Sequence, residues 1–156
     1  MTIKSWKEEF YPIPASKVVG SDDVALVKHS LQKWIGLRDE NLHKHNLHKV
    51  MHESNPILSS ADNRYEFRIS SENCALCLAH AMEVENEYTV HACETCPIYK
   101  SRGGFACDEC DEHASNEELS SVNPWSEFVD YNDPEPMIEA LEVALSYVNQ
   151  QESLSK

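Results

Sequence analysis

All six cysteines of this 156-residue chain lie between residues 74 and 110, where they form three C-x-x-C pairs. The pairs are Cys74 and Cys77, Cys93 and Cys96, and Cys107 and Cys110. A C-x-x-C turn can direct two sulfur atoms at one ion, and the first two pairs spell C-x2-C-x15-C-x2-C, a spacing typical of a four-cysteine zinc site. Because segment 71–113 has few large apolar residues of its own, we expect bound zinc to replace a hydrophobic core there.

The spacing leaves the ligand set open. Cys74, Cys77, Cys93 and Cys96 rank first as ligands, and Cys107 and Cys110 come next. Three nearby histidines rank last, because a lone histidine beside such a block is more often a hydrogen-bonded surface residue: His80, His91 and His113. A second site of two cysteines and two histidines and a single site that includes Cys107 are both compatible with the spacing, so we expect one or two zinc ions.

Two other interpretations of the cysteines are weaker. A redox dithiol is favoured by Asn73, which could cap a helix beginning at "CALC" and so lower a thiol pKa, but no strand–helix alternation suggests a thioredoxin-like scaffold. Structural disulfides need an oxidising compartment, and the N-terminus does not resemble a signal peptide. Leu78, Pro97 and Asp111 follow the second cysteine of each pair, where many zinc ribbons have glycine, so a helix-capped or loop-built site is expected.

The net charge of −14 is concentrated toward the C-terminus, because residues 105–156 contain thirteen acidic residues and a single cation, Lys156. Such a surface repels phosphate, which argues against direct nucleic-acid binding and fits a basic protein partner better. No stretch approaches the roughly 20 apolar residues of a membrane span. We therefore expect a cytoplasmic protein without membrane contact, and the sequence does not indicate its oligomeric state.

Hydrophobic periodicity predicts a single domain over 1–156, of the α+β class and mainly helical, with a small β-sheet and a zinc-stabilised middle. An extended segment anchored by Phe10 and Tyr11 is expected at 9–19, turns at 54–63, and a loop at 111–123. The alternation of Tyr65, Phe67 and Ile69 predicts a strand over 64–70. Helices are expected over 22–35, over 37–52 with the pattern fading near Asn46, from Pro124, and over 134–150.

Four histidines at 43, 45, 48 and 52 would share a helix under this assignment. The motif "HKVMH" at 48–52 has metalloprotease spacing, but Lys49 stands where the general-base glutamate of H-E-x-x-H would be. Hydrolysis is therefore unsupported, and a solvated helix face is the expected interpretation.

Several segments together resemble an uncharacterised family of bacterial and phage proteins. These segments are "WKEEFYPIPASKV", "HSLQKWIGL", "CALC", "CETCPIYKSRGGFAC", "NPWSEF" and "DPEPMIEAL". The resemblance implies that Cys74, Cys77, Cys93, Cys96 and Cys107 act as a unit, with Cys110 less firmly included. Asn123 stands where the family pattern has serine. The resemblance implies no reaction.

The sequence thus predicts a non-enzymatic zinc-binding protein, an interaction or regulatory module that presents its acidic C-terminal third to a protein partner. One alternative is a thiol redox or metal-dependent enzyme that uses the C-x-x-C pairs. Another is a phage-type inhibitor that mimics nucleic acid through residues 108–142.

Overall fold

A computed structural model describes residues 3–52, 55–60, 66–70, 73–80, 95–110 and 121–154. Its helices are α1 (Ile3–Phe10), α2 (Ala15–Val18), α3 (Asp23–Ile35), α4 (Asp39–Lys44), α5 (Ala75–His80), α6 (Pro97–Ser101), α7 (Pro124–Tyr131) and α8 (Glu135–Leu154). Its strands are β1 (Leu47–His52), β2 (Asn55–Ser60) and β3 (Glu66–Arg68). The described residues therefore form a mainly helical α+β fold with a small three-stranded antiparallel sheet, as predicted.

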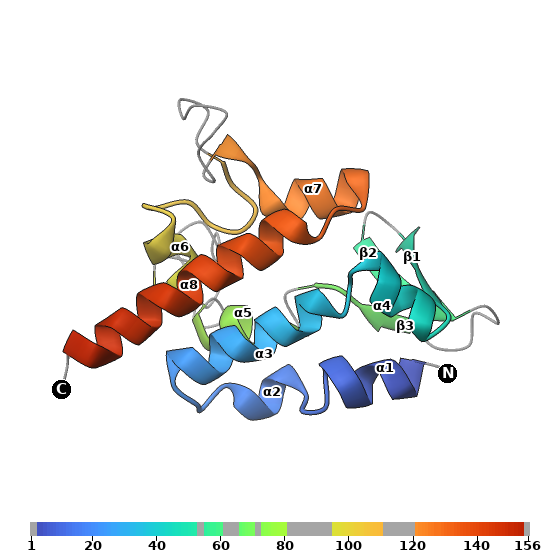
Figure 1. Cartoon of the computed structure of the whole chain (residues 1–156), viewed down its shortest axis with the longest axis horizontal. Helices are drawn as coiled ribbons and strands as arrows, with labels where there is room; N and C mark the ends of the chain where they lie inside the picture. The colour runs from blue at the N-terminus through green and yellow to red at the C-terminus, as the bar shows by residue number, and fades with distance from the viewer. Residues whose placement is uncertain are drawn as a thin grey trace, which may run out of the picture.

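Helix α3 lies at the centre of the fold, between α8 on one side and the α1–α2 pair on the other (Figure 1). It begins where the Asp22 carboxylate accepts a 2.9 Å hydrogen bond from the Ala25 amide, and its C-cap is Gly36. Helix α7 begins after Asn123, whose side chain accepts from the Ser126 amide at 3.1 Å. The predicted helices over 22–35, from 124 and over 134–150 are thus confirmed, although α8 continues to Leu154.

The sheet has the order β1-β2-β3 and sits at one end of the molecule, whereas α5 and α6 lie toward the other end (Figure 1). Strands β1 and β2 pair so that Leu47 lies opposite Ser60 and His52 opposite Asn55. The predicted helix is right for α4 but wrong for 47–52, and the predicted turns at 54–63 are wrong for β2. Strand β3 lies within the predicted strand, with Phe67 and Ile69 buried, and Tyr65 is outside the described residues.

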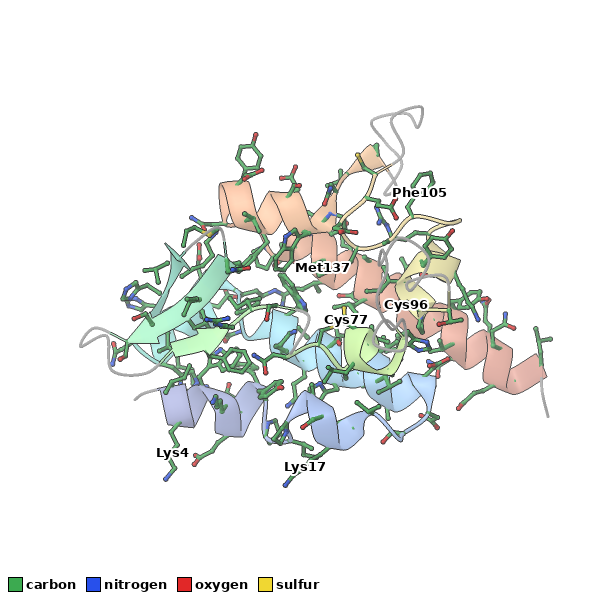
Figure 2. All side chains as sticks on the ribbon, turned by 180° about the vertical axis from the view of Figure 1, so that it is seen from behind. Lys4, Lys17, Cys77, Cys96, Phe105 and Met137 are labelled. Atoms are coloured by element: carbon green, nitrogen blue, oxygen red, sulfur yellow. The ribbon has the colours of Figure 1, made fainter. Side chains whose placement is uncertain are left out.

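The N-terminal region is helical rather than extended. Helices α1 and α2 flank the turn that contains Pro12 and Pro14, so the expected extended segment at 9–19 is wrong apart from that turn. The predicted anchoring is correct, because Phe10 and Tyr11 are buried. Lys4 and Lys17 project from the outer face of the α1–α2 pair, away from the rest of the molecule (Figure 2).

The described parts of the cysteine-rich segment join the hydrophobic core. Ala75 and Leu76 of α5 and Ile98 of α6 are almost fully buried in the same cluster as Trp34. Helix α5 contacts α3, and α6 contacts α8. A few well-placed aliphatic side chains therefore attach residues 73–80 and 95–110 to the central helices, and the expectation that zinc replaces a core in this segment stays a prediction.

Candidate metal centre

Two short helices position three of the cysteines. The Cys74 carbonyl accepts a 3.0 Å hydrogen bond from the Leu78 amide, so Cys74 begins the first turn of α5 and Cys77 lies one turn further on. Cys96 is the N-cap of α6 and is followed by Pro97, whose fixed φ suits the first helical position. Cys77 and Cys96 lie in the same part of the molecule, on neighbouring helices (Figure 2).

The loop after α6 brings a fourth thiol, that of Cys107, to the same core. Gly103 and Gly104 have φ values of 71° and 103°, which allow the chain to turn back sharply. The Arg102 guanidinium then donates to the carbonyls of Phe105, Ala106 and Val122. The Cys107 carbonyl accepts a 3.0 Å bond from the Trp125 amide, so the loop is fastened to the start of α7.

Hydrogen bonding and charge link four of the thiols. A hydrogen bond from Cys77 holds the pKa of the Cys74 thiol well below its ordinary value, despite burial, and Lys33 and Ser30 assist. The same hydrogen bond raises the pKa of Cys77, as do burial and the charges of Cys74, Cys107 and Cys96. The Cys74 and Cys77 thiols are thus hydrogen-bonded to each other, and the charges of Cys96 and Cys107 act on Cys77 although these cysteines come from three separate segments.

The five described cysteines are half-buried: Cys74, Cys77, Cys96, Cys107 and Cys110. Burial lowers the pKa of the Arg102 guanidinium, and the charges of Cys107 and Cys110 oppose that shift. Cys93 lies outside the described residues. Among the residues that the structure describes, no three His, Cys, Asp or Glu side chains are arranged as a ready-made metal site.

Two residues of α3 beside the thiols were not anticipated from the sequence. The Ser30 hydroxyl lies 3.7 Å from the Cys74 sulfur, and the Lys33 ammonium donates to the Asn73 carbonyl at 3.0 Å. Lys33 is 2% exposed. The burial of Ser30 and Lys33 could have been inferred from their spacing, because both fall on one helical face with Leu26. A lysine in such a stripe is, however, easily assigned to solvent.

The histidines beside the thiols are engaged elsewhere or are not described. His80 makes a 2.9 Å contact with Thr95 Oγ1 through Nδ1 and a 3.0 Å contact with Asp23 Oδ1 through Nε2. Both ring nitrogens therefore have partners, and His80 ties α5 to the start of α3. His91 and His113 lie outside the described residues.

The histidines between 43 and 52 do not share a helix, so the expected common face is wrong. His43 belongs to α4, whereas His48 and His52 are on β1. His45 is 2% exposed rather than solvated, and its ring contacts Ser5 Oγ at 2.8 Å and Glu9 Oε2 at 3.2 Å. A groove of about 600 Å³ opens beside His43 and His48, and it belongs to α4, β1 and α7 rather than to the thiols.

Comparison with protein-family models, with curated proteins and with solved structures finds no match to this chain. No helix in the described part of the chain is long and apolar enough to cross a membrane. The case for function therefore depends on the chemistry of the thiols. Soft sulfur donors select zinc and other thiophilic metals, and they bind as thiolates, which is the form that the lowered pKa of Cys74 favours.

Proposed function

We propose that the protein is a non-enzymatic zinc-binding protein in which Cys74, Cys77, Cys96 and Cys107 hold one structural Zn²⁺. The observation that carries the proposal is that thiols from three segments pack against one core, with Cys74 hydrogen-bonded to Cys77 and the charges of Cys96 and Cys107 acting on Cys77. The spacing ranked Cys93 above Cys107; Cys93 lies outside the described residues, so the variants below decide between the two. Binding draws the four sulfurs into one tetrahedral shell.

The magnitudes favour a stabilising role for the ion. Structural zinc contributes about 10–16 kcal/mol of apparent binding free energy in small peptides, which is comparable with the roughly 5–15 kcal/mol stability of a whole domain. In this chain the ion would join α5, α6 and the loop at 102–110. Both helices are short, and Leu76 and Ile98 are among the few apolar side chains that attach them to the core. Closed four-ligand sites have no open position for substrate, which supports a structural role.

We infer an interaction role from the surface of α7 and α8. Exposed carboxylates at 130, 135, 139 and 142 lie along these helices, and Arg38 pairs with Glu135 at 2.7 Å. A basic protein surface complements this arrangement, and its binding should weaken as ionic strength rises. Binding that is insensitive to salt would contradict an electrostatic interface, whether the partner is a basic regulator or a nucleic-acid-binding enzyme.

A second candidate, thiol–disulfide exchange, is favoured by one observation. Cys74 and Cys77 are hydrogen-bonded to each other, which lowers the pKa of the Cys74 thiol and places a thiolate beside a second thiol, as an attacking group and its resolving thiol require. An exchange protein purified under reducing, zinc-free conditions and then exposed to zinc would retain no stoichiometric metal. Its Cys74 would also react with iodoacetamide at neutral pH, whereas zinc-bound sulfur would be protected.

Elemental analysis of the purified, reduced protein tests the zinc proposal directly. We expect one zinc per chain, retained by a Cys110→Ser variant and lost when any of the four proposed ligands is replaced by serine. Cys110→Ser is the matched control, because Cys110 is a free, half-buried thiol of the same loop as Cys107. Zinc loss from Cys93→Ser with retention in Cys107→Ser would instead support the ligand set ranked first by spacing.

Chelation shows which part of the fold depends on the ion. Treatment with a zinc chelator should speed amide hydrogen exchange in 73–80 and 95–110, while α3 and α8 stay protected because most of the side chains packed with Trp34, Phe128 and Leu141 are aliphatic or aromatic. Loss of the far-UV helical signal in step with zinc release would contradict this division.

A further inference from the structure

Lys33 is a buried cation without a carboxylate partner among the described residues. It is 2% exposed, and the ion pairs of the described residues do not include it. Its ammonium donates one hydrogen bond, to the Asn73 carbonyl at 3.0 Å, and lies 5.9 Å from the centre of the Trp34 ring. An ammonium has three donors, and burying its charge is costly unless an anion faces it.

Lys33 reaches the chain directly before Cys74, because Asn73, which accepts the ammonium hydrogen bond, is the preceding residue. The charge of Lys33 also acts on the Cys74 thiol. Ser30, one turn earlier on α3, lies 3.7 Å from the same sulfur. Helix α3 therefore presents a hydroxyl and a charge to one edge of the thiol cluster.

We propose that Lys33 is the counter-ion of an all-thiolate centre, so that the site takes a thiophilic divalent metal as an anionic four-sulfur complex. This inference rests on the proposed function. A divalent ion with four thiolates is negatively charged overall, whereas the same ion with two thiolates and two imidazoles is neutral. A buried ammonium stabilises the first arrangement and gains nothing from the second. The engagement of both His80 nitrogens by Asp23 and Thr95 is consistent with a shell made of sulfur alone.

Titration of the zinc-free protein with Co²⁺ tests this role. Lys33→Met should weaken Co²⁺ binding about 10–100-fold, the range typical for groups that support metal ligands, and Lys33→Arg should restore much of the loss because it keeps the charge. Lys28→Met removes the same charge from an exposed position of α3 and should bind as wild type does. His80→Gln should leave the sulfur-to-cobalt charge-transfer absorption unchanged.

The stability of the metal-free variants separates a counter-ion from a packing role. Lys33→Met should lower the Tm of the Co²⁺-bound protein by more than it lowers the Tm of the metal-free protein, because only the loaded centre carries the additional negative charge that Lys33 balances. An equal or larger loss in the metal-free protein, or failure to fold, would show that Lys33 is structural and overturn the inference. So would Co²⁺ affinity equal to wild type in Lys33→Met, or a weaker charge-transfer band in His80→Gln. Wild-type protein that binds no Co²⁺ would overturn the proposed function itself.

Discussion

Replacing Gly36 by alanine should create a steric conflict between α1 and α3. A Cβ built on Gly36 would lie 2.5 Å from Cγ of Phe10, 2.7 Å from its Cβ and 2.8 Å from Cδ2. Carbon atoms pack at about 3.5–4.0 Å, so the ring would have to move by about 1 Å. It cannot do so freely, because Phe10 is buried against Trp6, whose indole also donates a 2.8 Å hydrogen bond to the Gly36 carbonyl.

Overpacking of a filled core costs about 1–3 kcal/mol, and we place Gly36→Ala near the upper limit because both contacting groups belong to packed helices. The backbone of Gly36 has φ −63° and ψ −15°, which alanine adopts without strain, so the loss would be steric. For a chain of this size, about 3 kcal/mol corresponds to a decrease in Tm of about 6–12 °C.

Thermal and urea unfolding followed by far-UV circular dichroism would measure the loss. Gly20→Ala is the control, because a Cβ at Gly20 meets nothing within 4 Å, and it should be neutral or slightly stabilising. In a double-mutant cycle, Phe10→Ala should remove part of the additional cost of Gly36→Ala, because it deletes Cγ and Cδ2 but keeps the Cβ that lies 2.7 Å away. Equal Tm values for the two glycine variants, or strict additivity with Phe10→Ala, would refute the steric reasoning.

Two further substitutions probe charged groups. Lys49→Met removes hydrogen bonds of 2.8 and 3.0 Å to the last-turn carbonyls of α7, and it removes the ammonium that lies 4.8 Å from the centre of the Phe128 ring. We expect it to lower the free energy of unfolding in urea by about 1.5–3 kcal/mol. An unchanged midpoint would show that the relief from burying the charge offsets these contacts. The hydrogen bond from Lys44 lowers the pKa of Glu9 from 4.5, so the folded state binds fewer protons than the unfolded state. The resulting stabilisation is present above pH 4.5 and is lost as the pH falls through the pKa of Glu9 in the folded state. Glu9→Gln should therefore flatten the decline of Tm below pH 4.5, whereas Glu8→Gln, exposed on the same helix, should follow wild type; identical acid profiles for Glu9→Gln and wild type would contradict the linkage.

The long helices could be predicted because their information is local. Helix α3 combines an acidic N-terminus with apolar residues at helical spacing, and α7 starts at an Asn-Pro pair. Strand β2 could not be recognised, because Pro56 resembles a turn residue and residues 56–59 are all buried, so the alternation of a half-buried strand is missing. The polar residues of β1 resemble the surface of a helix, and only pairing with β2 makes it a strand.

The sequence predicts which residue type forms the candidate metal centre, but it does not predict which of the cysteines belong to it. Cysteine spacing identifies the segment, yet the approach of Cys107 to Cys77 depends on the turn at Gly103 and Gly104 and on the contacts of Arg102, which are tertiary features. The burial of Lys33 likewise depends on α5 docking on α3. Local pattern therefore predicts a metal site, whereas the proposed ligand set and the proposed counter-charge depend on how the helices pack.

Three contacts fasten the chain on both sides of residues 111–120. Arg102 reaches the Val122 carbonyl, the Asn123 side chain donates to the Asp108 carbonyl at 2.7 Å, and the Trp125 amide donates to Cys107. The described residues on the two sides of that stretch are thereby held together. Because the entropy of closing a loop grows only slowly with its length, extra residues inserted between these fastened flanks should cost the rest of the molecule little stability.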